Sequence, residues 1–154
     1  MFFYYYNPPI GRLVIVQDNN GICQIVLPNR EIKVNATEKL TPVIERTINQ
    51  LEEYFQGERK SFDVPLSLKG TDFQLMVWRE LMKIPYGHTV CYSELAEKIR
   101  NPKAQRAVGM ANNRNPVPII VPCHRVVGKN GSLTGYAGGI EVKAKLLELE
   151  KDNI

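Results

Sequence analysis

Three prolines within eight residues constrain this chain more than any other feature of its sequence. The segment Asn115–Pro122 reads Asn-Pro-Val-Pro-Ile-Ile-Val-Pro, and each proline fixes one backbone torsion and restricts the residue before it. This pattern predicts an extended, rigid segment, and its isoleucines and valines indicate that it is buried. The segment leads directly into Cys123-His124-Arg125, which it would hold in a defined place.

Length and composition describe an ordinary globular protein. The chain has 154 residues, 44% hydrophobic and 23% charged, which suits one domain or two small ones. No apolar run approaches the roughly 18 residues of a membrane span. The N-terminus Met1–Tyr6 lacks the basic region and cleavage site of a signal peptide. Three widely separated cysteines argue against a disulfide scaffold and for a reducing compartment, so we expect a cytoplasmic protein without membrane attachment.

The first part of the chain predicts a small antiparallel sheet with one helix. Runs rich in aromatic and β-branched residues indicate three strands, at 2–6, 12–17 and 22–27. The turn residues Asp18–Gly21 join the second and third strands as a hairpin. Thr41 is expected to cap a helix that has Pro42 in its first turn and ends at Gly57.

The second part predicts a mainly helical domain. Apolar residues at helical spacing indicate four helices, at about 71–84, 93–99, 103–112 and 140–151. Thr71 and Gln74 form a capping box at the start of the first, and Ser93 is expected to cap the second. The expected fold class is therefore α+β. An N-terminal α/β domain over 1–70 precedes a mainly helical C-terminal domain over 71–154, which contains a helix-turn-helix and is winged-helix-like.

The basic charge of the chain is concentrated around the two short central helices. Residues 1–70 hold eight basic and eight acidic side chains, whereas the 43 positions from Lys98 to Ile140 hold seven basic side chains and no acidic one. Two short helices joined by a tight turn, with Arg106 on the second, form a helix-turn-helix pattern. A solvated basic face would explain the charge alone, but its coincidence with this pattern favours DNA as the partner.

Cys123 is the candidate nucleophile. Basic neighbours lower the pKa of a thiol, so the adjacent His124 and Arg125 are expected to raise its thiolate fraction. A lone cysteine can also be a small buried hydrophobic residue, an interpretation that suits Cys23 and Cys91. A zinc site is not expected, because the chain has no Cys-x-x-Cys pair.

A carboxylate is expected to orient His124. Neighbouring side chains on an extended strand point to opposite faces, so either the chain turns after Cys123 or a water links it to His124. On the last helix Glu150 falls in the middle of the apolar face, and a buried carboxylate needs a partner. His124 is one candidate, Lys143 on the same face competes with it, and a frayed, solvated helix end is the third possibility.

These residues resemble the O6-alkylguanine-DNA alkyltransferases, also called methylated-DNA–protein-cysteine methyltransferases. Pro122-Cys123-His124-Arg125-Val126 matches the active-site signature of that family. Further matches are spread over about Phe73 to Glu150, at Ile84-Pro85-Tyr86-Gly87, Tyr92, Asn101-Pro102-Lys103, Arg106-Ala107-Val108-Gly109, Asn115-Pro116-Val117-Pro118 and Gly135-Tyr136-Ala137-Gly138-Gly139. The first 70 residues resemble the variable N-terminal domain of the family only in general character.

The resemblance implies a DNA repair protein that acts once. It implies that the protein flips O6-alkylguanine, and also O4-methylthymine, out of double-stranded DNA and transfers the alkyl group irreversibly to Cys123. His124 would act as base through a water, Glu150 would orient His124, Asn115 would brace the turn, and Tyr92 would donate a proton to the departing base. The family relationship implies a monomer that needs neither a metal nor an organic cofactor.

The resemblance also implies residues that bind the lesion and the DNA. Arg106 would take the place of the flipped nucleotide, the Val126 carbonyl would accept from the exocyclic amine of guanine, and the Ala137 amide would donate to O6. The remaining members of this group are Tyr136, Gly138, Arg125 and Ala107. Ala137 stands where some relatives have serine, and Asn112 and Asn113 occupy variable positions near the pocket, which leaves the range of substrates open.

Three other functions compete with this hypothesis. A non-enzymatic alkyltransferase-like protein would bind lesions without chemistry, but such proteins replace the acceptor cysteine, which is present here as Cys123. A helix-turn-helix regulator would leave the Pro122–Val126 run and Glu150 unexplained. A cysteine hydrolase would need a remote histidine, for which only His88 is available.

Overall fold

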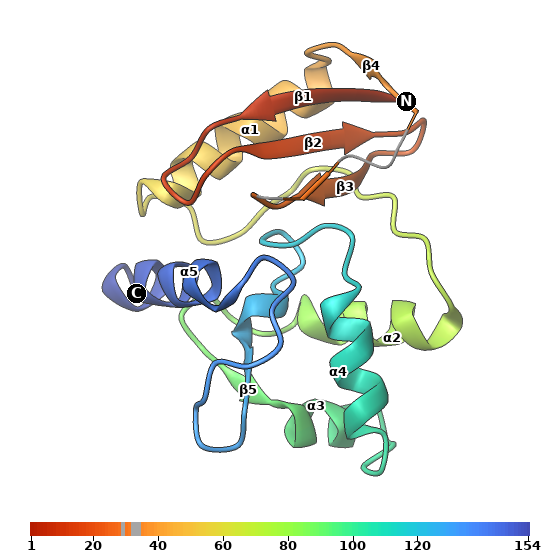
Figure 1. Ribbon diagram of the computed structural model, residues 1–154, viewed down its shortest axis with the longest axis vertical. Helices are drawn as coiled ribbons and strands as arrows, with labels where there is room; N and C mark the ends of the chain where they lie inside the picture. The colour runs from red at the N-terminus through yellow and green to blue at the C-terminus, as the bar shows by residue number, and fades with distance from the viewer. Residues whose placement is uncertain (29, 32–34) are drawn as a thin grey trace. The chain divides into compact units, whose positions relative to one another are not determined.

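The chain folds as two successive units, Met1–Lys69 and Gly70–Ile154, the first built on a sheet and the second mainly of helices. Figure 1 shows the computed structural model, which describes residues 1–28, 30–31 and 35–154. Each unit forms its own layers of secondary structure, and the family signature lies in the second unit. No helix among these residues is long and apolar enough to span a membrane.

The first unit contains a four-stranded sheet in the order β3-β2-β1-β4. Its strands are β1 (Phe2–Tyr6), β2 (Leu13–Gln17), β3 (Ile22–Val26) and β4 (Thr37–Glu38). The three predicted strands are confirmed, and they pair antiparallel as β1–β2 and β2–β3. The sheet as a whole is mixed, not purely antiparallel, because β4 returns beside β1 in the same direction, with Phe2 opposite Thr37. Both residues of β4 are exposed, so this strand has no hydrophobic pattern that reveals it.

One helix, α1 (Pro42–Phe55), packs on this sheet (Figure 1). The Thr41 side chain accepts a hydrogen bond from the Ile44 amide and caps the helix as predicted. The helix buries Ile44, Leu51 and Tyr54 completely. Their apolar area, together with that of β2, forms the core of the first unit.

The second unit consists of four helices and a short two-stranded sheet. Its elements are α2 (Asp72–Leu81), β5 (Val90–Cys91), α3 (Tyr92–Lys98), α4 (Gln105–Asn113), a 3-10 turn (Cys123–Arg125), β6 (Val126–Val127) and α5 (Ile140–Asp152). The capping box of Thr71 and Gln74 is present at the start of α2. Helices α3 and α4 pack together as the predicted helix-turn-helix, and β5 pairs in parallel with β6.

Three helix boundaries in this unit differ from the prediction. Helix α4 begins at Gln105, two residues after the predicted start. Helix α2 ends at Leu81, because the backbone forms tighter turns after it. The Lys83 amide donates to the Glu80 carbonyl, and the Ile84 amide donates to the Leu81 carbonyl. Helix α3 begins at Tyr92, with Cys91 as its N-cap in place of Ser93. Glu94 accepts a hydrogen bond from the Cys91 amide, so the carboxylate of the third helical residue sets this start.

Candidate active site

The Cys123 turn is the centre of the candidate site. Cys123–Arg125 forms one 3-10 turn, closed by hydrogen bonds from the Arg125 amide to the Pro122 carbonyl and from the Val126 amide to the Cys123 carbonyl. The chain therefore turns directly after Cys123, which is the first of the two possibilities that the sequence left open. Cys123 and His124 consequently need not project to opposite faces of a strand.

The proline-rich segment before this turn is rigid and buried but not extended, which corrects the prediction. Ile119 has a φ of 75°, and the Val121 amide bonds back to the Val117 carbonyl, so the segment folds into a turn of its own. The Asn115 side chain bridges that turn. Its Oδ1 accepts from the Val117 amide at 3.0 Å, and its Nδ2 donates to the Val121 carbonyl at 2.7 Å. These hydrogen bonds within the segment offset the strain of a β-branched residue at positive φ.

Burial dominates the chemistry of the Cys123 thiol. The residue is 4% exposed, and desolvation raises the pKa of the thiol from 9.0 to about 11. A hydrogen bond from Asn115 and the positive charge of Lys143 act in the opposite direction but are smaller. The expectation that basic neighbours lower this pKa is therefore wrong, because loss of water around the thiolate outweighs them.

His124 is completely buried and contacts Glu150. Its Nε2 lies 2.6 Å from Glu150 Oε2, and its Nδ1 has no hydrogen-bond partner in the part of the chain that the structure describes. Desolvation lowers the pKa of His124, and the hydrogen bond and charge of Glu150 only partly offset this. A neutral imidazole that donates from Nε2 has a lone pair on Nδ1, so His124 is poised to accept a proton there.

Glu150 lies inside the unit, as the helical wheel predicted, and is 1% exposed. The Arg125 guanidinium binds it with two nitrogens, Nε to Oε1 at 2.8 Å and Nη2 to Oε2 at 3.0 Å, and the Gly87 amide donates to Oε1. Arg125 also donates to the Ile84 carbonyl. Its guanidinium is thus part of the buried network, which corrects the expectation that Arg125 contacts substrate or DNA.

Lys143, which the sequence offered as an alternative partner for Glu150, binds a backbone carbonyl in the structure. Its Nζ donates to the Thr134 carbonyl at 2.9 Å, and burial lowers the pKa of the ammonium group. The Tyr92 hydroxyl donates to the same carbonyl at 3.1 Å. Two donors from α3 and α5 therefore meet at one carbonyl of the glycine-containing loop 128–139.

Tyr92 and Tyr136 both lie close enough to Cys123 for its charge to affect them. Burial is the main cause of the raised pKa of each phenol, and the charge of a Cys123 thiolate adds to it. The Tyr136 side chain is nearly buried, and its hydroxyl has no partner among the described residues. Both phenols are consequently neutral hydrogen-bond donors at neutral pH.

The remaining candidates differ in how deeply they are buried. Val126 is buried in β6, and Ala137 and Gly138 are half-buried in loop 128–139. Arg106 and Ala107 lie in the first turn of α4, where both are exposed. The exposed candidates are therefore on α4, and the buried ones are on the Cys123 turn, β6 and the loop 128–139.

Asn112 contacts the site but was given no role in the sequence. It is 1% exposed on α4, and its Nδ2 donates to the Cys123 carbonyl at 3.3 Å. The sequence feature that could have revealed it is a polar residue on the apolar face of that helix, which also carries Val108 and Ala111.

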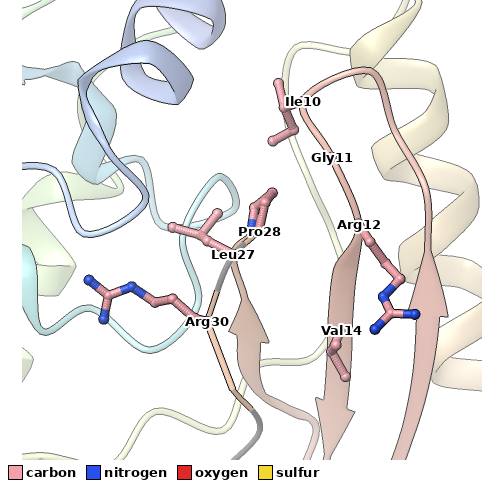
Figure 2. A pocket seen from close by; sticks show the side chains of 7 residues that line it. All are labelled: Ile10, Gly11, Arg12, Val14, Leu27, Pro28 and Arg30. Carbon is pink, nitrogen blue, oxygen red and sulfur yellow. The ribbon is translucent and has the colours of Figure 1, made fainter.

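The described residues form no metal site, and one further hollow lies in the first unit. Within residues 1–28, 30–31 and 35–154, no three His, Cys, Asp or Glu side chains group as metal ligands. A hollow of about 490 Å³ in the first unit is lined by Ile10, Gly11, Arg12, Val14, Leu27, Pro28 and Arg30. Figure 2 shows that Arg12 and Arg30 point in opposite directions, so their charges do not converge on a ligand.

Fold and site together define a class of protein. A buried cysteine, a histidine with a free Nδ1 and a buried carboxylate stand beside a helix-turn-helix, an arrangement suited to nucleophilic chemistry in a DNA-binding unit.

Comparison with known proteins identifies the family. Residues 72–152 match the model for the "6-O-methylguanine DNA methyltransferase, DNA binding domain", and residues 1–68 match that for its "ribonuclease-like domain". The chain belongs to the 6-O-methylguanine DNA methyltransferase family.

Individual relatives cover nearly the whole chain. A methylated-DNA–protein-cysteine methyltransferase of Methanosarcina mazei is 46% identical, over 100% of this chain and 99% of its own. The constitutive enzyme of that name from Bacillus subtilis is 48% identical, over 93% and 91%. Among solved structures, the OGT of Mycobacterium tuberculosis in complex with DNA superimposes with a TM-score of 0.93 at 44% identity, covering 99% of this chain and 94% of that chain.

Proposed function

We propose that this protein repairs O6-alkylguanine in double-stranded DNA by transferring the alkyl group to its own Cys123. The contact of His124 Nε2 with Glu150, which leaves Nδ1 without a partner beside the Cys123 turn, carries the proposal. This arrangement suits removal of the thiol proton within a buried site. The similarity to methylated-DNA–protein-cysteine methyltransferases supports the same reaction.

The first step makes the nucleophile. His124 accepts the Cys123 proton at Nδ1 through one intervening water, and the imidazolium is stabilised by the Glu150 carboxylate. Because the thiol pKa is about 11 in the free protein, little thiolate is present at neutral pH until this transfer occurs. The buried site therefore keeps Cys123 unreactive in the absence of substrate.

The second step transfers the alkyl group. The thiolate attacks the alkyl carbon, a carbon–sulfur bond forms, and the bond from that carbon to O6 breaks with its electrons passing to the base. Tyr92 donates its hydroxyl proton to the base, which leaves as neutral guanine, and the imidazolium proton restores the tyrosine through solvent. The thioether has no good leaving group, so each chain reacts once.

Access to the lesion requires base flipping, since the alkylated atom is shielded inside the stacked duplex. Helix α4 would lie against the DNA, with Arg106 filling the gap and Ala107 beside it. The flipped base would then be held by the Val126 carbonyl, the Ala137 amide, Gly138 and the Tyr136 ring. The burial of Val126 directly after the Cys123 turn and the effect of a Cys123 thiolate on the pKa of Tyr136 support this assignment.

The test is the mass of the intact protein after mixing with duplex DNA that carries O6-methylguanine. We expect a gain of one methyl group per chain, located on Cys123 by peptide mapping, and none in Cys123→Ala. Lesion binding without a mass gain would favour a non-enzymatic lesion-binding protein, and turnover beyond one methyl group per chain would exclude the single-use mechanism. We propose that the active species is a monomer in the cytoplasm, where reducing conditions keep the thiol free.

A further inference from the structure

The turn Ile84–Gly87 is a sequence motif to which the proposed reaction assigns no role. It lies shortly after α2 and is closed by a hydrogen bond from the His88 amide to the Pro85 carbonyl at 3.1 Å. The proline fixes one backbone torsion of the turn, so the backbone groups around it have little freedom. Two groups of this turn contact the buried pair of Arg125 and Glu150.

The first contact holds Arg125. Its Nη1 donates to the Ile84 carbonyl at 2.7 Å, and its guanidinium lies 5.7 Å from the centre of the Tyr86 ring. A guanidinium presents its donors in a rigid, planar fork, so fixing one nitrogen fixes the direction of the other two. Those two nitrogens bind Glu150. The turn therefore sets the plane in which Arg125 meets the carboxylate.

The second contact holds Glu150 directly. The Gly87 amide donates to Oε1 at 3.1 Å, whereas Oε2 lies 2.6 Å from His124 Nε2. The last torsion of a glutamate side chain has no sharp minimum, and a hollow of about 400 Å³ beside Glu150 leaves the carboxylate room to move. The hydrogen bonds to Oε1 consequently decide where Oε2 lies relative to His124.

The Gly87 amide has this direction because the residue has no side chain. Its φ of 77° lies in the left-handed region, which glycine adopts without strain. A Cβ atom at this position would also lie 2.6 Å from Cγ1 of Ile154 and 2.9 Å from its Cδ1. Any larger residue would therefore shift the turn or Ile154, and the amide would move relative to Glu150.

We propose that Gly87 is a positioning residue of the repair reaction. Together with the Ile84 carbonyl, its amide holds the buried ion pair so that Glu150 stays in contact with His124. This inference rests on the proposed function, in which His124 removes the thiol proton. A base that is already in place when the substrate binds need not be ordered during the reaction, which lowers the barrier.

The first experiment observes the contact between His124 and Glu150 in the full chain without DNA. The chain has two histidines, and His88 is exposed, so nitrogen-15 spectra of the imidazole rings distinguish them. The unmodified protein should show a low-field Nε2 proton on His124, as a short hydrogen bond to a carboxylate produces. In Gly87→Ala this proton should move upfield and exchange with water at least about tenfold faster.

The second experiment measures single-turnover methyl gain from duplex O6-methylguanine. Gly87→Ala should react about tenfold more slowly at neutral pH, the effect of one hydrogen bond to a charged group. The deficit should shrink as the pH rises, because hydroxide then removes the thiol proton without His124. Gly57→Ala is the matched control, since Gly57 has a φ of 78° and follows α1 in the first unit. It should leave both the His124 proton and the rate unchanged.

A second variant keeps the backbone of the turn. Tyr86→Leu removes the ring beside Arg125 and should move the His124 proton in the same direction by a smaller amount, and it decides the question if Gly87→Ala does not fold. An unchanged His124 proton in the folded variant, or a deficit in rate that is equal at every pH, would overturn the inference and leave the repair reaction intact. Absence of methyl gain in the unmodified protein would instead refute the proposed function.

Discussion

At the scale of single residues, burial sets the reactivity of this site more strongly than charge. Cys123 lies in a chain with a formal net charge of +4, yet its pKa rises to about 11 because water is excluded from the thiolate. The guanidinium of Arg125, two residues further along the chain, is already paired with Glu150. A protein that reacts once benefits from such a thiol, since unproductive alkylation would consume it.

The pKa of Cys123 predicts a steep pH dependence in the free protein. Because only the thiolate reacts, alkylation of Cys123 by iodoacetamide should rise about tenfold per pH unit from pH 8 towards the pKa of about 11. Peptide mass spectrometry, with Cys123→Ala as background, measures this residue separately from Cys23 and Cys91. A plateau below pH 9 would show that the thiolate is stabilised and contradict the burial effect.

Glu150→Gln should slow alkyl transfer by at least about tenfold at neutral pH. The carboxylate raises the pKa of His124, so its loss makes the imidazole a weaker base, and the apparent thiol pKa in the pH–rate profile should rise. Superimposable profiles would show that Glu150 is not coupled to Cys123. The exposed Glu148→Gln on the same helix is the matched control.

The same substitution leaves Arg125 without its buried partner. Removing one member of a buried ion pair costs about 3–5 kcal/mol, so Glu150→Gln should also unfold at lower denaturant concentration. Adding Arg125→Met removes the unpaired charge and should restore part of the stability without restoring the rate. A return of the rate with the stability would reduce Glu150 to a structural role.

At the scale of elements, the buried and exposed residues of α4 lie on opposite faces of the helix. Its inner face packs Val108 and Ala111 and reaches the Cys123 carbonyl through Asn112, and its outer face carries Arg106. The Ala111 carbonyl is bound by the Trp78 indole at 2.9 Å, which fixes the end of the helix. A helix held in this way keeps its exposed face in a fixed position relative to the Cys123 turn.

Arg106→Ala tests the outer face of α4. If Arg106 stabilises the extruded nucleotide, the variant should repair duplex O6-methylguanine at least about tenfold more slowly while reacting normally with the free base. Single-turnover rates on the two substrates measure the difference. Arg79→Ala, an exposed arginine at the end of α2, is the control, and equal losses on both substrates would assign Arg106 a structural role.

A further prediction concerns the loop 128–139, which α3 and α5 both contact through the Thr134 carbonyl. Lys143→Met removes the donor from α5 to the Thr134 carbonyl and leaves only the Tyr92 hydroxyl there. Amide hydrogen exchange of residues 133–136 should accelerate by about tenfold, since local opening then breaks fewer buried contacts. Lys145→Met, exposed on the same helix, serves as control. Unchanged exchange would mean that the loop is held by other contacts.

Local sequence rules predicted the elements that local interactions determine. The Thr71–Gln74 capping box and the Thr41 cap depend on neighbours three residues away, and the helical wheel placed Glu150 inside because α5 is regular. The turn at Ile119 depends instead on hydrogen bonds that the Asn115 side chain makes within its own segment, which simple pattern rules do not cover. The edge strand β4 depends on pairing with β1, which is distant in sequence. The pKa of Cys123 was missed for the same reason, since burial is a property of the fold.

At the scale of the whole molecule, charge is divided unequally between the two units. The first 70 residues are balanced, and the excess of basic residues lies in the second part, chiefly in the acid-free stretch from Lys98 to Ile140. Such a distribution concentrates the attraction for phosphates on the unit that holds α4 and Cys123. Association with DNA is therefore expected to depend on that unit and on ionic strength.

Salt dependence tests this distribution on undamaged duplex DNA. Each phosphate contact releases counterions, so the logarithm of the affinity should fall linearly with the logarithm of the salt concentration, by roughly 0.9 for every contact. Lys103→Ala, in the exposed turn between α3 and α4, should lower this slope by about one contact. Lys60→Ala, exposed in the first unit, where acidic and basic residues balance, should leave the slope unchanged.

Fluorescence anisotropy between 50 and 200 mM salt, roughly the range in which such contacts are lost, gives the slopes. A slope near zero, or an equal effect of the two lysines, would show that the basic stretch does not direct DNA binding.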